Sequence, residues 1–142
     1  MDKAKVALVT GASRGAGKGI ALGFAAEGAI VYITGRSKSE ATETLKGELL
    51  SGTLDETADA IIAAGGQAIC IECDHADDQQ TAQAIQRISD EQGRLDILVN
   101  NAGAIPSGDL WDVDQKNWRN GWDLKVYGYI DMCREFYTKM KN

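Results

Sequence analysis

Short apolar runs alternate with amphipathic stretches along the chain. The apolar runs are rich in β-branched residues, which is typical of strands. They cover residues 5–10, 29–34, 67–73 and 95–99. Between them, apolar residues recur at three- and four-residue steps over 15–27, 53–64 and 78–92, which predicts helices. Strands that alternate with helices predict an α/β fold in three layers, a parallel sheet covered by helices on both faces.

The segment before the second predicted helix has the least regular pattern. Residues 39–52 contain leucines at helical spacing, but Gly47 and Gly52 interrupt it, so we interpret this segment as a surface insertion. The sequence Thr53-Leu54-Asp55-Glu56 then matches a capping box, which opens a helix. The residues expected on the buried face of that helix are Leu54, Ala58, Ile61 and Ile62. On the predicted helix over 78–92, the expected buried residues are Ala84, Ile85 and Ile88.

A long helix is predicted from about Val113 to Lys141. Apolar residues recur along it at helical steps, and such a stripe is typical of a core or of a subunit interface. The stripe consists of Trp118, Trp122, Val126, Tyr129, Cys133, Phe136 and Met140. A sheet of four strands would leave the edge of the fourth strand and this stripe uncovered, so we expect a partner or self-association. The assembly that we expect is a homo-oligomer that forms through this helix.

A glycine loop connects the first strand to the first helix. In Thr10-Gly11-Ala12-Ser13-Arg14-Gly15-Ala16-Gly17, the glycines are spaced G-x-x-x-G-x-G. Glycine lets the backbone adopt conformations closed to other residues and come close to a ligand. The free N–H groups of the loop and the positive end of the following helix then suit a phosphate group. We therefore interpret Gly11–Gly17 as a nucleotide-binding loop.

Two related motifs are excluded by counting. The P-loop requires glycine at position 12 and serine or threonine at position 19, where this chain has Ala12 and Gly19. The G-x-G-x-x-G fingerprint is not met either, because three residues separate Gly11 from Gly15. The loop is therefore of another type, and a tight turn without a ligand is the alternative.

Arginines stand where many dinucleotide-binding folds have an acidic residue. That acid follows the second strand and accepts a hydrogen bond from the ribose 2′-OH. Here the second strand is followed by Arg36, with no acid before Glu40, and Arg14 lies inside the glycine loop. Two guanidinium groups fit a 2′-phosphate. The alternative is that both arginines are solvated loop residues.

Composition and charge narrow the possible partners. The 142 residues suit a single domain, and a net charge of −6 without a basic cluster disfavours nucleic acid and anionic membranes. No apolar run is long enough to span a bilayer. The charged start Met1-Asp2-Lys3 does not resemble a signal peptide, so a cytoplasmic location is expected.

The three cysteines are Cys70, Cys73 and Cys133, and the first two have C-x-x-C spacing. This spacing occurs in redox pairs and zinc sites. Residues three apart on a strand point to opposite faces, however, and His75 is the only histidine. We therefore interpret the cysteines as core residues and expect no metal site.

The fourth strand runs directly into Asn100-Asn101-Ala102-Gly103, at the edge of the sheet where ligands lie in open α/β folds. With the glycine loop before it and Cys73-Asp74-His75-Ala76-Asp77 between them, the chain resembles the short-chain dehydrogenases/reductases over its whole length. The resemblance implies a Rossmann-type, doubly wound sheet that is incomplete at the C-terminal side. It also implies a nicotinamide cofactor.

The resemblance assigns roles to individual residues. The glycine loop would hold the pyrophosphate, Asp74 would bond the adenine amine, and Asn100 would lie beside the adenosine ribose. Arg14 and Arg36 agree with a preference for NADP(H) over NAD(H). The implied cofactor-binding residues are Gly11, Ser13, Arg14, Gly15, Ala16, Gly17, Arg36, Asp74, His75, Asn100, Ala102 and Gly103.

The family's catalytic residues are not found in this chain. They are a serine on a fifth strand and a Tyr-x-x-x-Lys on the next helix. Tyr137 and Lys141 have this spacing, but they lie on the predicted long helix without an intervening strand, so we interpret the match as a coincidence. Lys125 stands where the family often has an asparagine that anchors a proton-relay water, and Ala16 replaces a usual isoleucine. For Lys125, a water- or ribose-binding role and a neutral variant position both stay open.

Residues 1–142 are therefore expected to form the cofactor-binding domain of an NADP(H)-dependent oxidoreductase, without its catalytic half. The intact protein would transfer hydride between nicotinamide and a carbonyl or alcohol group of a small-molecule substrate. We assign no catalytic residue and expect little or no turnover by this chain alone. The alternative is a non-catalytic nucleotide-binding or interaction module that associates through the Trp118–Met140 helix.

Overall fold

Four parallel strands form the central sheet of the computed structural model, which describes residues 3–45, 47–103 and 108–140. The strands are β1 (Val6–Thr10), β2 (Ile30–Gly35), β5 (Gln67–Glu72) and β6 (Ile97–Val99). Their order in the sheet is β5-β2-β1-β6, so the chain moves outward from β1 on one side and then pairs β6 with the other side of β1. This reversal is the doubly wound topology that the sequence predicts.

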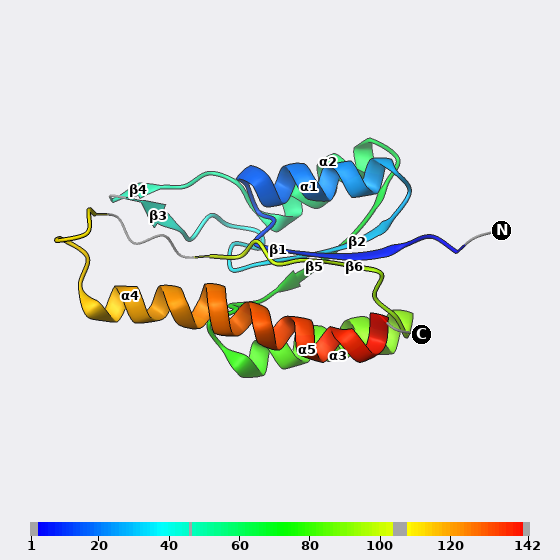
Figure 1. Cartoon of the computed structure of the whole chain (residues 1–142). Coiled ribbons are helices and arrows are strands. Elements are labelled where there is room, and N and C mark those ends of the chain that lie inside the picture. Colours follow the sequence, from blue (N-terminus) through cyan, green and yellow to red (C-terminus); the bar gives the residue numbers. More distant parts are fainter. Residues whose placement is uncertain (1–2, 46, 104–107, 141–142) are drawn as a thin grey trace.

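Helices cover both faces of the sheet (Figure 1). On one face lie α1 (Gly15–Ala26) and α2 (Leu54–Ala63), and on the other lie α3 (Asp78–Gln92) and α5 (Gly128–Met140). Because both faces are covered, β1 is buried at every position. The predicted α/β class and its three layers are therefore confirmed.

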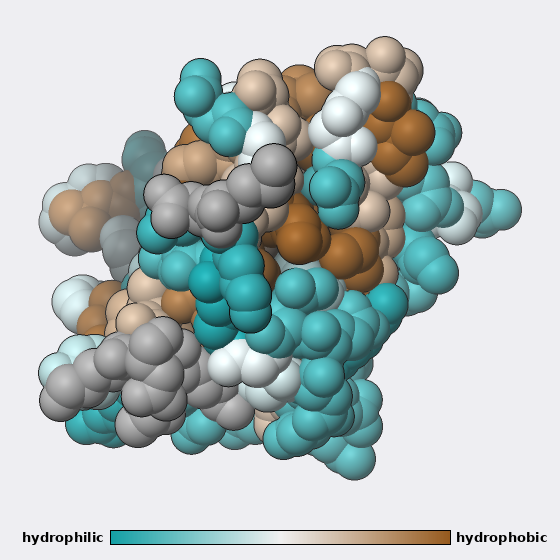
Figure 2. Space-filling model, turned by 90° about the vertical axis from the view of Figure 1, so that its right-hand side faces the viewer, coloured by the Kyte–Doolittle hydropathy of each residue, from teal (hydrophilic) through white to brown (hydrophobic). Residues whose placement is uncertain are grey.

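The alternation of side chains along the strands divides the apolar core in two. Leu8 and Tyr32 belong to the cluster beneath α3 and α5, whereas Val9 and Ile33 belong to the cluster beneath α1 and α2. Figure 2 looks onto the end of the molecule that carries the N-terminus, where hydrophobic residues gather in the centre above hydrophilic ones. The loops that follow the carboxyl ends of the strands lie at the opposite end.

The N-terminal cap of α2 is the one that the sequence predicts. Thr53 Oγ1 accepts a hydrogen bond from the Glu56 N–H at 3.1 Å, as the capping-box pattern predicts. The expectation that Ile62 faces the core is wrong, because this side chain is 58% exposed. It lies about 100° further round the helix than the buried Ile61, and Thr57 completes the buried face instead. For α3, the predicted bounds and buried face are confirmed.

Residues 39–52 form a surface insertion, as predicted, but its leucines do not form a helix. The segment contains a short antiparallel pair, β3 (Thr44–Leu45) and β4 (Glu48–Leu49), in which both leucines are exposed. Figure 1 shows this pair at the end of the molecule to which the carboxyl ends of the strands point. The insertion therefore lies on the side of the sheet where ligands are expected.

The C-terminal helix is continuous but not uniform. It consists of α4 (Gln115–Trp122), a π-helical turn η1 (Asp123–Tyr127), and α5. Figure 1 shows α4 extending past the end of the sheet, and no residue of α4 is buried. Of the two interpretations of the stripe, a core position is wrong for Trp118, Trp122 and Met140, which are exposed, and a subunit interface stays a prediction for them.

Two features explain this difference. Where α4 extends past the sheet, the described part of the chain buries none of its residues. In addition, a π-helical turn takes more residues than an α-helical turn, so the apolar face of α4 is rotated relative to that of α5. Among the α5 side chains that the structure describes, Met132 and Phe136 are buried. None of the described helices is both long enough and apolar enough to cross a bilayer.

Candidate functional site

The loops that follow β1 and β6 are held together by the side chains of Thr10 and Asn101. Thr10 Oγ1 donates to the Val99 carbonyl at 3.1 Å and accepts from the N–H groups of Asn101 and Ala102 at 2.9 and 3.0 Å. Asn101 Nδ2 donates to the carbonyl oxygens of Thr10 and Gly11, each at 3.0 Å. These bonds satisfy backbone groups that leave the sheet at this edge, so they fix the two loops relative to each other.

Two glycines are required by this contact between the loops. Gly11 has a φ of +67°, and a Cβ there would lie 2.8 Å from Ala102 Cα. At Gly17, a Cβ would lie 2.3 Å from the carbonyl oxygen of Gly11 and 2.6 Å from Asn101 Nδ2. Neither position has room for a side chain. The start of α1 therefore packs directly against the backbone of both loops.

Gly15 faces open space instead. Its φ is +57°, and a Cβ there would have no atom within 4 Å. It is the first residue of α1, and Arg14 before it makes no side-chain capping bond. The N–H groups of the first turn therefore have no side-chain cap, and together with the helix dipole they suit a phosphate. Ala16 is exposed at this turn, whereas Ser13 is buried.

The arginines predicted to bind a 2′-phosphate both contact the insertion. Arg14 donates from Nε to the Ser51 carbonyl at 2.9 Å and from Nη2 to the Gly52 carbonyl at 3.0 Å. Arg36 forms an ion pair with Glu43. Arg14 therefore holds the insertion beside the glycine loop. Arg36, whose side chain is 47% exposed, is the more accessible of the two guanidinium groups.

Asp74 and His75 follow β5 at the same edge of the sheet. Asp74 Oδ1 accepts a hydrogen bond from the Ala76 N–H at 2.9 Å, which shapes the turn. His75 Nε2 lies 2.7 Å from Thr34 Oγ1 on β2. Burial lowers the pKa of His75 to about 4, against a weaker opposing effect of the Asp74 carboxylate. At neutral pH the imidazole is therefore uncharged.

A small polar cavity lies between these residues and the C-terminal helix. Its volume is about 40 Å³, and its lining includes Thr10, His75, Thr81, Asn100 and Tyr129. Within the described part of the chain, two buried polar atoms, Thr81 Oγ1 and Asn100 Oδ1, make no hydrogen bond. A buried polar atom without a partner is costly, so these atoms suit a polar ligand group or an ordered water.

The C-terminal helix supports the Asn100–Gly103 loop. Asn100 Nδ2 donates to the Tyr129 carbonyl at 3.4 Å, and the Tyr129 hydroxyl donates to the Ala102 carbonyl. Burial raises the pKa of Tyr129, so this hydroxyl stays protonated at neutral pH and supports the loop. Lys125, on η1, lies against Gly103, where a Cβ would be 2.2 Å from Lys125 Cε.

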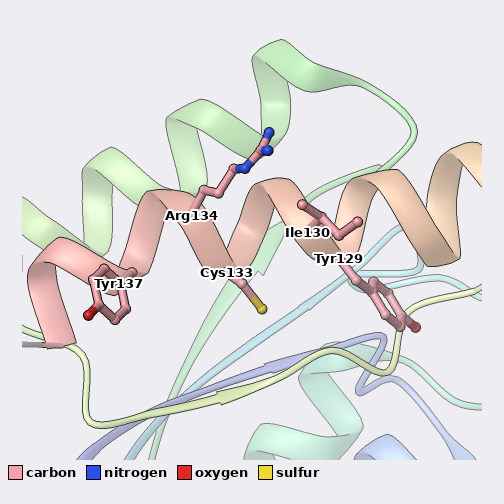
Figure 3. Close-up of a pocket in the computed structure, with 5 residues that line it drawn as sticks. All are labelled: Tyr129, Ile130, Cys133, Arg134 and Tyr137. Atoms are coloured by element: carbon pink, nitrogen blue, oxygen red, sulfur yellow. The ribbon is translucent and has the colours of Figure 1, made fainter.

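A larger groove of about 520 Å³ lies on α5 (Figure 3). Figure 3 shows Tyr129, Cys133 and Tyr137 pointing to the same side of the helix, whereas Arg134 points the other way. The groove is open and lined mainly by apolar and aromatic groups, so the glycine loop and the small polar cavity are the stronger candidate site. Tyr137 lies on this groove, and Lys141 lies outside the described residues.

The cysteines do not form a site. Cys73 belongs to the cluster beneath α3 and α5, and Cys70 packs against the opposite cluster. Burial raises the pKa of each of these two thiols to about 11. The core interpretation is confirmed for them and wrong for Cys133, which is exposed. In residues 3–45, 47–103 and 108–140, no group of three or more His, Cys, Asp or Glu side chains is arranged to hold a metal ion.

The structure brings most of the predicted residues to one edge of the sheet, in the loops that follow its four strands. Sequence reasoning did not identify Thr10 and Asn101 as the residues that hold these loops together. A threonine that ends a buried strand just before a loop was the available signal for Thr10. For Glu43 there was no signal, because its contact with Arg36 depends on the path of the insertion.

Comparisons with known proteins agree with this arrangement. A family model described as short chain dehydrogenase matches residues 5–142. The chain is 35% identical to a 3-oxoacyl-[acyl-carrier-protein] reductase of Synechocystis sp., over 96% of this chain and 50% of the relative. It is 36% identical to dehydrogenase/reductase SDR family member 1 of Mus musculus, over 97% of this chain and 42% of the relative. The chain thus spans about half the length of these relatives.

Solved structures give the same picture. A metagenomic short-chain oxidoreductase in complex with NADP superposes with a TM-score of 0.80 and 31% identity, over 96% of this chain and 56% of the other. L-sorbose reductase from Gluconobacter frateurii, complexed with NADPH and L-sorbose, superposes with a TM-score of 0.81 and 27% identity. That match covers 97% of this chain and 48% of the reductase.

Proposed function

The chain belongs to the short-chain dehydrogenase family, and we propose that it carries the cofactor-binding part of an NADP(H)-dependent oxidoreductase. The bound nicotinamide would exchange a hydride with a carbonyl or alcohol group of a small-molecule substrate. The observation that carries this proposal is the close packing of the glycine loop against the Asn100–Gly103 loop, which leaves the first turn of α1 open.

The residues at this edge fit a dinucleotide. The uncapped N–H groups that start at Gly15 would bind the pyrophosphate. Asn100 Oδ1, a buried acceptor without a partner in the described structure, would accept a hydrogen bond from the adenosine ribose. One carboxylate oxygen of Asp74 shapes the turn, and the other would accept from the adenine amine. His75, uncharged at neutral pH, would lie at the adenosine end of this site.

Two observations support NADP(H) over NAD(H). Arg36 follows β2 at the position where an acidic residue would bind a free ribose 2′-OH, and its guanidinium suits a 2′-phosphate. In addition, two structurally similar proteins carry NADP or NADPH in their complexes. Arg14 would contribute through its position at the start of α1, although its side chain also binds the insertion.

The proposal assigns no catalytic residue to this chain. The family's serine and Tyr-x-x-x-Lys are expected in the half of the relatives that this chain does not span. Tyr137 lies on α5, which follows the fourth strand of the parallel sheet (β6), whereas the family's tyrosine lies on a helix after a fifth strand of that sheet. We therefore interpret the spacing of Tyr137 to Lys141 as a coincidence. We therefore expect residues 1–142 to act as a cofactor-binding domain with little or no turnover alone.

A titration of the purified chain with NADPH and NADH tests this proposal, with energy transfer from tryptophan to nicotinamide as the signal. We expect NADPH to bind at least tenfold more tightly than NADH. Arg36→Ala should remove most of this difference, because the guanidinium that faces the 2′-phosphate is lost. Arg119→Ala, on the exposed α4, is the control and should bind as the unchanged chain does. If the chain binds neither NADPH nor NADH, the proposal is wrong.

The exposed C-terminal helix supports a second role. Trp118, Trp122 and Tyr127 are 44%, 57% and 60% exposed, an unusual accumulation of large apolar side chains on one helix. We propose that this helix mediates self-association, either within the oxidoreductase or as the main role of a non-catalytic interaction module. A cytoplasmic location remains a prediction.

A further inference from the structure

The insertion over residues 39–52 places a carboxylate on the arginine that the proposed function assigns to the 2′-phosphate. Arg36 Nη2 forms an ion pair with Glu43 Oε2. The Arg36 side chain is 47% exposed and that of Glu43 is 24% exposed, so the pair lies at the surface but is not fully solvated. Glu43 does not belong to the turn that directly follows β2. It lies in the insertion, just before β3.

The position of Glu43 is determined by contacts on both sides of it. Before it, the Thr42 N–H donates to Ser37 Oγ at 3.2 Å. At Glu43 itself, the carbonyl oxygen accepts from the Leu50 N–H at 2.8 Å, which closes the β3–β4 hairpin. The side chain is therefore presented to Arg36 by a fixed segment of backbone.

The far end of the insertion is held against the glycine loop. Arg14 donates to the carbonyl oxygens of Ser51 and Gly52 at 2.9 and 3.0 Å. The backbone of Gly52 is so close that a Cβ there would lie 2.6 Å from the Ser13 carbonyl oxygen. With Arg14 engaged in this way, Arg36 is the arginine that remains accessible to a ligand, and Glu43 is the group that a ligand meets there.

A 2′-phosphate at Arg36 would interact unfavourably with this carboxylate. If the phosphate takes the N–H group that Glu43 accepts from, it must displace Glu43, and if it takes other N–H groups of Arg36, the two negative charges are neighbours. Both arrangements weaken the binding of a 2′-phosphate, whereas a free ribose hydroxyl carries no charge. Glu43 therefore weakens the binding of NADP(H) relative to NAD(H) in either arrangement.

We propose that Glu43 is a specificity-determining residue that competes with the cofactor 2′-phosphate for Arg36 and limits the preference for NADP(H) over NAD(H). This inference rests on the proposed function, because it requires that a dinucleotide binds at the glycine loop. The insertion thereby sets how strongly the chain discriminates between the two cofactors.

The test compares Glu43→Gln with the unchanged chain in titrations with NADPH and NADH. Glutamine keeps the shape of glutamate and removes its charge, so NADPH should bind about two- to fivefold more tightly, in line with a partly exposed ion pair. NADH affinity should stay the same. Glu48→Gln is the matched control, since Glu48 lies on the same hairpin and is exposed. It should change neither affinity.

The outcomes separate this inference from the proposed function. If the unchanged chain binds neither cofactor, the proposed function fails and the inference fails with it. If both cofactors bind but Glu43→Gln leaves the ratio of the two affinities unchanged, only the inference fails. A weaker affinity for NADH in Glu43→Gln also overturns it, because Glu43 would then bind the ribose hydroxyl. In an Arg36→Ala background, Glu43→Gln should gain less affinity for NADPH than it gains alone.

Discussion

The carboxyl edge of the sheet and the C-terminal helix differ in how they are connected to the rest of the molecule. At the edge, Thr10 and Asn101 bind the backbone of both loops, and Gly11 and Gly17 have no room for a Cβ. Along the helix, Met132 and Phe136 are buried, but the apolar side chains of α4 are exposed. One region is determined by backbone contacts within the chain, and the other leaves large apolar side chains exposed.

This difference shows why the two regions respond differently to sequence change. Where backbone packs on backbone, a single added methyl group has no space, because well-packed interiors do not yield easily. Where side chains face solvent, a substitution costs little free energy of unfolding and acts instead on association. We therefore expect stability and cofactor binding to depend on the edge, and oligomeric state to depend on the helix.

At the carboxyl edge, the largest effect is expected for Gly17→Ala. The new Cβ would meet the Gly11 carbonyl oxygen at 2.3 Å and Asn101 Nδ2 at 2.6 Å, so the loops must separate. We expect a loss of about 3 kcal/mol in the free energy of unfolding, at the upper end of the usual cost of overpacking. Cofactor binding should be lost as well. Urea denaturation followed by circular dichroism measures the first, and the nicotinamide titration measures the second.

Gly19→Ala is the matched control, because it makes the same change two residues later on the same helix. A Cβ at Gly19 would have no atom within 4 Å, and the residue is exposed. Alanine favours a helix over glycine by about 1 kcal/mol, so this variant should be as stable as the unchanged chain or more stable. Similar losses in Gly17→Ala and Gly19→Ala would contradict the assignment of the close contact to Gly17.

The same contrast explains how much the sequence could predict. The glycine spacing predicted a tight loop before α1, and the Asn100–Gly103 motif predicted a loop at the carboxyl edge of the sheet, because each follows from a short stretch of sequence. The buried face of α3 was predicted for a similar reason, since its periodicity is regular. Which residues of the stripe on the C-terminal helix are buried could not be predicted, because the π-helical turn and the extension of α4 past the sheet are not local properties of the sequence.

A second prediction concerns the pH dependence of stability at the carboxyl edge. Burial lowers the pKa of His75 to about 4 from an ordinary value of 6.5, so the folded state favours the neutral imidazole. This contribution is fully present above pH 6.5 and is lost as the pH falls towards 4. Between pH 7 and pH 5, we expect the free energy of unfolding to fall by about 1–2 kcal/mol through this residue.

The contribution of His75 is isolated by comparison with His75→Gln. Glutamine can still bond Thr34 Oγ1 but does not titrate in this range, so the variant should lose less stability over the same interval. The difference between the two denaturation series removes the effect of the carboxylates, which titrate in both proteins. Equal pH dependence in the two proteins would show that His75 does not carry the effect.

The smallest effect on stability is expected for Trp122→Gln, on the exposed part of the helix. This side chain is 57% exposed, so its replacement should change the free energy of unfolding by less than about 0.5 kcal/mol. If the helix mediates self-association, the same change removes a large apolar contact from the interface and weakens association. Sedimentation velocity over a range of protein concentrations measures this, and the unchanged chain should associate at lower concentration than the variant.

Phe136→Ala, on the same continuous helix, is the comparison variant that should change stability strongly. Phe136 is fully buried against the sheet, so its truncation should destabilise the fold by about 3–5 kcal/mol. A Trp122→Gln variant that associates as strongly as the unchanged chain would exclude this part of the helix from the interface. A variant that is destabilised as much as Phe136→Ala would mean that Trp122 is covered within the chain itself. If Trp122→Gln weakens association and leaves stability unchanged, the result supports a helix whose α5 part packs in the core and whose α4 part contacts another molecule.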